Sequence, residues 1–114
     1  MSPWLMYAGV GQVHTAPVSH GEGRFIASPE LLRALAEGGQ IATQYCDADG
    51  NPSMDILHNP NGSVGAVEGI TSPDGRVFGK MAHSERVGFA KPIYKNVPGN
   101  YDNGMFRGAV DYFR

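Results

Sequence analysis

The sequence predicts an α+β fold in which mainly antiparallel strands are accompanied by two helices. Short runs rich in β-branched residues recur along the chain, and such runs are typical of strands. Two of them, residues 64–70 and 77–81, are separated by a tight turn at 72–75, and this spacing predicts an antiparallel hairpin. Apolar residues recur at helical spacing in two places, residues 29–37 and 104–113.

The N-terminal part is predicted to contain two short strands. Residues 12–20 carry Val, Thr and Ser at the spacing of a strand, and Gly21 and Gly23 then interrupt the pattern. Residues 24–27 (Arg-Phe-Ile-Ala) predict a second strand directly after these glycines.

Residues 29–37 carry the most complete set of helix signals. Ser28 suits the N-cap, Pro29 suits the first helical position, and Glu30 complements the helix dipole. Glycines at 38–39 end the pattern. The apolar stripe of this helix comprises Leu31, Leu32, Leu35 and Ala36.

The remaining elements follow in a regular order. Residues 41–46 alternate as a half-buried strand does, and the turn at 47–52 follows them. Residues 59–63 (Asn-Pro-Asn-Gly-Ser) predict another turn, after which come the two strands of the hairpin. The stripe of the last helix comprises Met105, Phe106, Ala109, Val110 and Phe113.

The composition excludes several classes of protein. The 114 residues suit one small domain covering residues 1–114. A net charge of −2 and a pI near 6.0 give no reason to expect nucleic acid or an anionic membrane as a partner. No apolar run approaches the ~20 residues of a membrane span, and the first residues lack the basic region and apolar core expected of a signal peptide. The single cysteine fits a reducing compartment, so we expect a cytoplasmic domain.

Two His-x-Glu pairs could carry chemistry: His20 with Glu22, and His83 with Glu85. On an extended segment, residues two apart point to the same face. A carboxylate in that position can orient an imidazole and stabilise its protonated form, as the acid of a nucleophile–His–acid triad does. The second pair follows the predicted strand at 77–81, where a rigid element ends and the side chains become accessible. A surface histidine beside a solvated glutamate is the alternative for either pair.

Two other kinds of site are weaker candidates. A metal site lacks the usual ligand spacings, and the sequence contains no nucleotide-binding glycine pattern. The turn at 59–63 could present amide donors to a ligand, although such a turn is more often structural. The possible metal ligands are His14, His20, His58, His83 and Cys46.

Cys46 is a poor candidate for the nucleophile. A nucleophile elbow needs small residues around the nucleophile and a helix after it. Cys46 is instead flanked by Gln44, Tyr45, Asp47 and Ala48, and a turn follows it. A small half-buried thiol is therefore the favoured interpretation, and the residues provide a base and an acid without a nucleophile.

Four segments taken together resemble a known family. They are residues 17–25, 59–63, 69–77 and 80–86. Their order and spacing resemble those of the class I glutamine amidotransferase domain at the C-terminal end of the large, single-chain phosphoribosylformylglycinamidine synthases of purine biosynthesis. The separate glutaminase subunit of the same enzyme, which shares the His-Gly-Glu-Gly loop, is the alternative source of this resemblance. The resemblance implies that this chain is the C-terminal half of an α/β glutaminase domain.

The resemblance also implies roles for individual residues. His83 and Glu85 correspond to the histidine and glutamate that complete the catalytic triad, with Ala82 and Ser84 in place of two prolines. The glutamine substrate is then expected to bind near three residues of the first His-x-Glu segment, namely Ser19, His20 and Glu22.

The partners follow from the same resemblance. The nucleophile is expected in an upstream half of the domain, so this chain alone should not hydrolyse glutamine. ATP and magnesium are expected in a separate synthase domain that uses the ammonia, and no cofactor is expected in this chain. A lone half-domain is expected to form a homo-oligomer. The rival hypothesis is a non-catalytic module that only packs against the rest of a synthetase.

Overall fold

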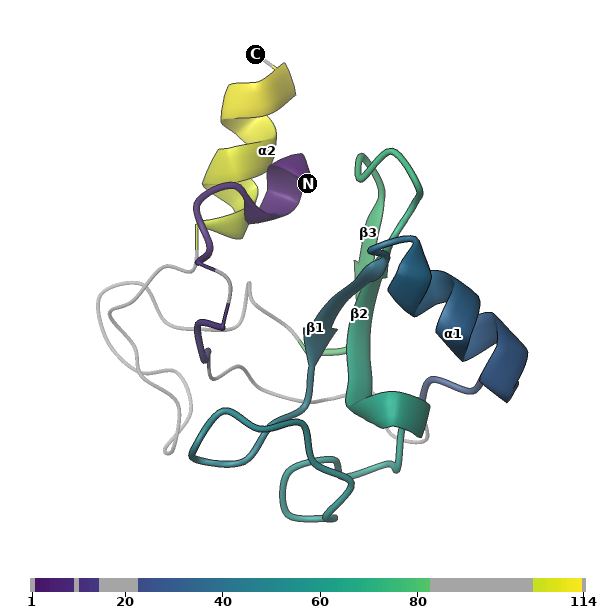
Figure 1. Ribbon diagram of the computed structural model, residues 1–114. Coiled ribbons are helices and arrows are strands. Elements are labelled where there is room, and N and C mark those ends of the chain that lie inside the picture. The colour runs from purple at the N-terminus through teal and green to yellow at the C-terminus, as the bar shows by residue number, and fades with distance from the viewer. Residues whose placement is uncertain (1, 10, 15–22, 83–103, 114) are drawn as a thin grey trace.

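The computed structural model describes residues 2–9, 11–14, 23–82 and 104–113, and its α+β architecture confirms the predicted fold class (Figure 1). Two helices and a sheet of three antiparallel strands make up the regular structure of these residues. In chain order the elements are η1 (Pro3–Leu5), α1 (Pro29–Glu37), β1 (Ile41–Gln44), η2 (Val64–Ala66), β2 (Val67–Thr71), β3 (Phe78–Lys80) and α2 (Met105–Phe113), where η denotes a short 3₁₀-helix.

The hairpin predicted from the turn at 72–75 is present. β2 pairs with β3 in an antiparallel register that aligns Gly69 with Lys80 and Thr71 with Phe78. Gly75 adopts a φ of +75°, which a glycine reaches without steric cost. The hairpin brings the chain that follows β3 back along the central strand of the sheet.

The pairing of β1 with β2 is irregular. Thr43 aligns with Gly69 and Gln44 with Val67, so the register shifts between neighbouring residues. Gly69 makes this close approach possible, because a Cβ there would lie only 2.5 Å from the Thr43 Oγ1 atom. The strand predicted at 41–46 is shorter in the structure, where it ends at Gln44.

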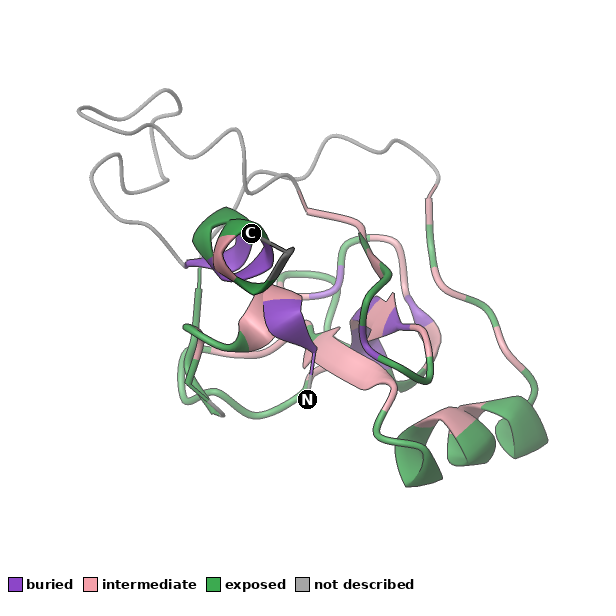
Figure 2. Cartoon of the chain, turned by 90° about the horizontal axis from the view of Figure 1, so that it is seen from above, coloured by how far each residue is buried: buried purple, intermediate pink, exposed green. Residues whose placement is uncertain are grey.

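Helix α1 forms where its signals predict. The Ser28 hydroxyl accepts a hydrogen bond from the Leu31 N–H at 3.2 Å and so caps the N-terminus. Only half of the predicted stripe is covered, because Leu32 and Leu35 are half-buried while Leu31 and Ala36 are exposed. Figure 2 accordingly shows α1 as exposed along most of its length.

Helix α2 packs against η1 at the other end of the molecule (Figure 1). The covered face differs from the predicted stripe, since Met105, Gly108 and Ala109 are buried whereas Phe106 and Val110 are exposed (Figure 2). Gly108 explains the difference: a Cβ there would lie 2.5 Å from the Pro3 carbonyl oxygen, so this glycine faces the contact.

Both chain ends are joined to the hairpin turn. The Ser2 hydroxyl donates to the Gly75 carbonyl at 2.6 Å, and the Trp4 indole N–H donates to the Arg76 carbonyl at 2.9 Å. From α2, the Tyr112 ring lies 6.0 Å from the Arg76 guanidinium carbon. The hairpin thus connects the terminal pair η1–α2 to the sheet.

Three other strand predictions differ from the structure as well. Residues 24–27 form no strand, because among the described residues only Phe25 is paired there. Its carbonyl accepts from the Val64 N–H, and its N–H donates to the Ser63 hydroxyl. Residues 12–14 of the predicted strand at 12–20 form none either, and the rest of that strand lies outside the described residues. β2 begins at 67 and not at 64, because Gly65 and Ala66 have φ of 63° and 56° in the left-handed region.

Candidate functional site

The five predicted site residues lie outside the part of the chain that the structure describes. They are Ser19, His20, Glu22, His83 and Glu85. They belong to two segments, residues 15–22 and 83–103. The structure describes His14 and Gly23, which flank the first segment, and Ala82, which precedes the second. The surroundings of these three residues therefore define the candidate site.

The chain enters the His83–Glu85 motif from a network of polar contacts at the end of β3. The Glu68 carboxylate on β2 accepts a hydrogen bond from the Ala82 N–H, with an N···Oε1 distance of 2.7 Å. The same Oε1 atom lies 3.1 Å from the Lys80 ammonium, which also donates to the Ala82 carbonyl at 2.7 Å. On the other side, the Thr43 hydroxyl donates to Glu68 Oε2 at 2.5 Å. Residues from all three strands thus hold the residue that precedes His83.

This network is largely shielded from solvent. The Glu68 side chain is 9% exposed and that of Lys80 is 17% exposed. Nearby, burial and then the negative charge of Glu68 raise the pKa of Tyr45 to about 12. A carboxylate this shielded from water is stabilised by its ion pair and its hydrogen bonds.

The other segment returns to the described fold at Gly23, where the loop at 59–63 holds it. The Asn61 amide donates to the Gly23 carbonyl at 2.7 Å. Two residues later, the Phe25 N–H donates to the Ser63 hydroxyl at 3.0 Å. The loop therefore fixes the chain directly after Glu22.

The loop itself is held by reciprocal hydrogen bonds. The Asn59 amide nitrogen donates to the Ser63 carbonyl at 3.0 Å, and its amide oxygen accepts from the Ser63 N–H at 2.9 Å. Both residues are 1% exposed. The structural interpretation of this turn is therefore the better one, because these amide groups are occupied within the chain.

His14 is the described residue directly before the first segment. Burial lowers the pKa of the His14 imidazole, and the positive charge of Lys80 lowers it further. The imidazole therefore lies within electrostatic reach of the Lys80 ammonium.

Cys46 does not occupy a nucleophile elbow. It forms a single antiparallel bridge with Pro52, and a turn closed by the Asp47 N–H and the Asn51 carbonyl at 2.9 Å lies between them. No helix follows Cys46 in the described residues before η2. Its surroundings fit the half-buried structural thiol that the sequence favoured.

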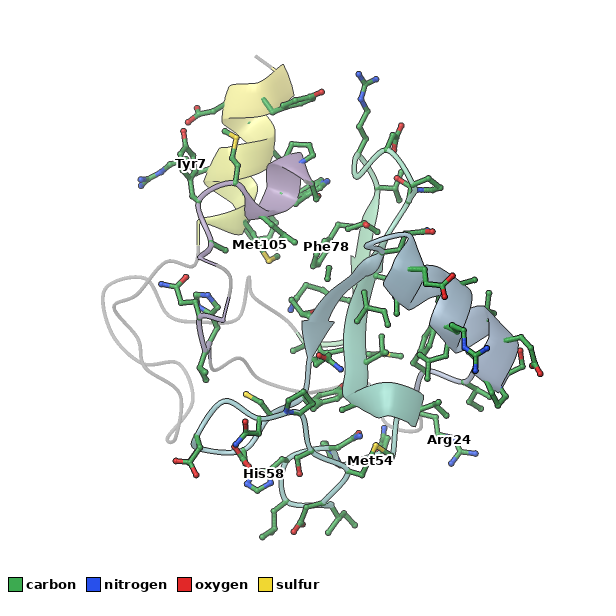
Figure 3. The ribbon with its side chains drawn as sticks, viewed as in Figure 1. Tyr7, Arg24, Met54, His58, Phe78 and Met105 are labelled. Atoms are coloured by element: carbon green, nitrogen blue, oxygen red, sulfur yellow. The ribbon has the colours of Figure 1, made fainter. Side chains whose placement is uncertain are left out.

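The possible metal ligands are not gathered in the described part of the chain. No group of three His, Cys, Asp or Glu side chains there is placed to hold a metal ion. His58 lies in the loop at the lower end of the sheet, where its Nδ1 is 3.4 Å from the Ser53 hydroxyl (Figure 3). His20 and His83, the other histidines of that hypothesis, lie outside the described residues.

Of the described helices, none has the length and apolar character that crossing a membrane requires.

Sequence reasoning missed the network around Glu68. Its signal was a lone acidic residue in the apolar run at 64–70 together with a lone basic residue, Lys80, in the second strand of the hairpin. Charged residues on adjacent strands often pair in this way. Thr43 carried no comparable signal, because its contribution depends on the irregular register of β1.

Comparisons with known proteins identify the family of the chain. The family model of the CobB/CobQ-like glutamine amidotransferase domain matches residues 1–113. Three similar relatives carry the name phosphoribosylformylglycinamidine synthase subunit PurQ. The relative from Thermomicrobium roseum is 42% identical over 75% of this chain and 35% of its own length. That from Methanococcus maripaludis is 35% identical over 92% and 44%, and that from Synechococcus elongatus is 38% identical over 96% and 42%.

The chain thus spans between a third and a half of the length of these curated relatives. The family match nevertheless covers nearly every residue, including both His-x-Glu segments. The chain belongs to the CobB/CobQ-like glutamine amidotransferase family.

Proposed function

We propose that this chain supplies the His–Glu part of a glutaminase site that releases ammonia for phosphoribosylformylglycinamidine synthase. The names of the PurQ relatives support the reaction class. The observation that supports the proposal is the network around Ala82, the residue directly before His83, whose N–H is held by Glu68 of β2 and whose carbonyl is held by Lys80 of β3. Catalytic groups work best where a rigid element sets their geometry.

The proposed chemistry divides the work between two parts of one domain. A cysteine thiolate from the complementary part attacks the side-chain amide of glutamine. The resulting tetrahedral intermediate collapses to a thioester as His83 gives a proton to the departing ammonia. His83 then takes a proton from the water that hydrolyses the thioester, while Glu85 keeps the imidazole oriented.

Substrate binding falls to the first His-x-Glu segment in this proposal. Ser19, His20 and Glu22 line the glutamine site. Gly23, directly after them, is held by Asn61, and His14 lies within electrostatic reach of the Lys80 ammonium. The ammonia passes to a synthase domain that uses ATP and magnesium to amidate formylglycinamide ribonucleotide in the cytoplasm.

The test uses a complete glutaminase domain, made by joining this chain to the upstream residues of a PurQ relative and pairing it with the synthase. His83→Ala should abolish glutamine-dependent synthesis and leave synthesis from free ammonia largely intact, because free ammonia bypasses the glutaminase. Glu85→Ala should cost less, since the imidazole remains. Cys46→Ser serves as the control and should leave both activities unchanged.

Two outcomes would contradict the proposal. If His20→Ala removed glutamine-dependent activity while His83→Ala were mild, the two His-x-Glu pairs would exchange roles. If the joined domain folded and bound the synthase but never released ammonia from glutamine, the chain would be a packing module without catalytic residues.

A further inference from the structure

We infer that Glu68 is a positioning residue for His83, acting through the backbone of Ala82. This inference rests on the proposed function, because it gives His83 the role of the proton carrier. In the described part of the chain Glu68 contacts Thr43, Lys80 and Ala82, and the role inferred for it is exerted through Ala82.

The first step of the argument concerns the backbone of Ala82. An alanine has a free φ and an N–H group that needs an acceptor, whereas a proline would have neither. Here the Glu68 carboxylate is the acceptor, at 2.7 Å. The residue before His83 is therefore fixed by a side chain from the central strand and not by a ring of its own.

The second step concerns the carbonyl of the same residue. Lys80 Nζ donates to the Ala82 carbonyl oxygen at 2.7 Å and lies 3.1 Å from Glu68 Oε1. Glu68 thereby holds the N–H of Ala82 directly and its carbonyl through Lys80. That carbonyl belongs to the planar peptide bond that joins Ala82 to His83, so its orientation sets the direction in which the chain continues.

The third step concerns the rigidity of Glu68. Its second oxygen accepts from the Thr43 hydroxyl, and only 9% of the side chain is exposed. Gly69 leaves the room for this contact, because a Cβ at that position would meet the Thr43 hydroxyl. A carboxylate held at both oxygens in a protected site keeps one orientation, and so does the backbone that it binds.

The test compares three variants in the complete glutaminase. Glu68→Ala should lower kcat for glutamine hydrolysis by about tenfold or more, with little change in KM, because it removes alignment and not substrate contacts. Glu68→Gln should restore most of kcat, because its amide oxygen can still accept from Ala82. The matched control is Glu37→Ala, which removes an exposed glutamate from the last turn of α1 and should change neither parameter.

A double-mutant cycle covers the case in which Glu68→Ala disturbs folding. Ala82→Pro removes the N–H donor, so adding Glu68→Ala to that background should cost much less in kcat than it costs alone. An equal cost in both backgrounds would show that Glu68 only stabilises the sheet and would overturn the inference. Unchanged kcat in a folded Glu68→Ala variant would overturn it as well.

The two proposals fail in distinguishable ways. If His83→Ala hydrolysed glutamine at the parent rate, the proposed function would fail whatever Glu68 did. If His83→Ala were inactive and Glu68→Ala fully active, the positioning role alone would be wrong.

Discussion

At the scale of single residues, Gly69 shows how one missing side chain controls the sheet. Its partners are Thr43 on β1 and Lys80 on β3, and both approach it closely. A Cβ at Gly69 would lie 2.5 Å from Thr43 Oγ1 and 3.3 Å from the Lys80 Cβ. A side chain at this position would therefore force the Thr43 hydroxyl to move and would crowd β3.

Gly69→Ala is accordingly expected to lower the free energy of unfolding by about 1–3 kcal/mol, the usual cost of overpacking. Urea denaturation monitored by circular dichroism measures this change. Gly79→Ala on the neighbouring strand is the matched control, because a Cβ there meets no atom within 4 Å. Equal effects of the two substitutions would show that the contact around Gly69 is looser than described.

Tyr45 supplies a prediction about pH. Its pKa is raised from 10.0 to about 12, first by burial and then by Glu68. The folded state therefore keeps the phenol proton that the unfolded chain releases above its own pKa. This contribution to stability is fully present below pH 10 and is lost as the pH rises from 10 toward 12. The unfolding free energy of Tyr45→Phe should fall less steeply across that interval than that of the parent, and Glu68→Gln should lower the phenol pKa in an NMR titration.

At the scale of elements, the contact between α2 and η1 reverses an ordinary propensity. Alanine is favoured over glycine in a helix by about 1 kcal/mol. At Gly108, however, an added Cβ would lie 2.5 Å from the backbone oxygen of Pro3. The contact between the elements therefore decides the identity of this residue, and the helix propensity does not.

Gly108→Ala should consequently weaken the packing of α2 on η1 even though it favours the helix. The single tryptophan, Trp4, reports on this contact because its ring lies edge-on to Phe106 with centroids 6.4 Å apart. Its near-ultraviolet circular dichroism should decrease in the variant. Val110→Ala, at an exposed position of the same helix, should leave the signal unchanged.

The elements that could be predicted from sequence are those with local signals. The cap at Ser28 specified α1, and the turn at 72–75 specified the hairpin. The strand predicted at 24–27 failed because a strand requires a partner along its length, and Phe25 alone is paired there. The network around Glu68 depends on contacts among three strands, and a single sequence does not display such contacts.

At the scale of the whole molecule, much apolar surface is uncovered in the described residues. Ile56 and Leu57 are 73% and 83% exposed, and Phe106 and Val110 on α2 are at least half exposed. β1 and β3 are the outer strands of the described sheet. Each uncovered Å² of apolar surface costs about 25 cal/mol, and an outer strand offers backbone groups for pairing.

The chain on its own is therefore expected to associate with further copies through a strand edge or the apolar helix faces. Light scattering over a dilution series should show a dimer or larger oligomer that dissociates on dilution. Joining the chain to the complementary part of a glutaminase should suppress this association. A monomer at every concentration would contradict the prediction and would mean that the chain covers its own apolar core without a partner.

The attachment of the N-terminus to the hairpin has a consequence for folding kinetics. The hydrogen bonds of Ser2 and Trp4 to the hairpin turn join residues separated by 73 and 72 positions in the sequence. Contacts between such distant residues close large loops and form slowly compared with a hairpin. In a stopped-flow refolding experiment, Trp4 fluorescence should therefore reach its native value after the sheet has formed. The residues of η1 would then become ordered last, although the ribosome makes them before the sheet to which they attach.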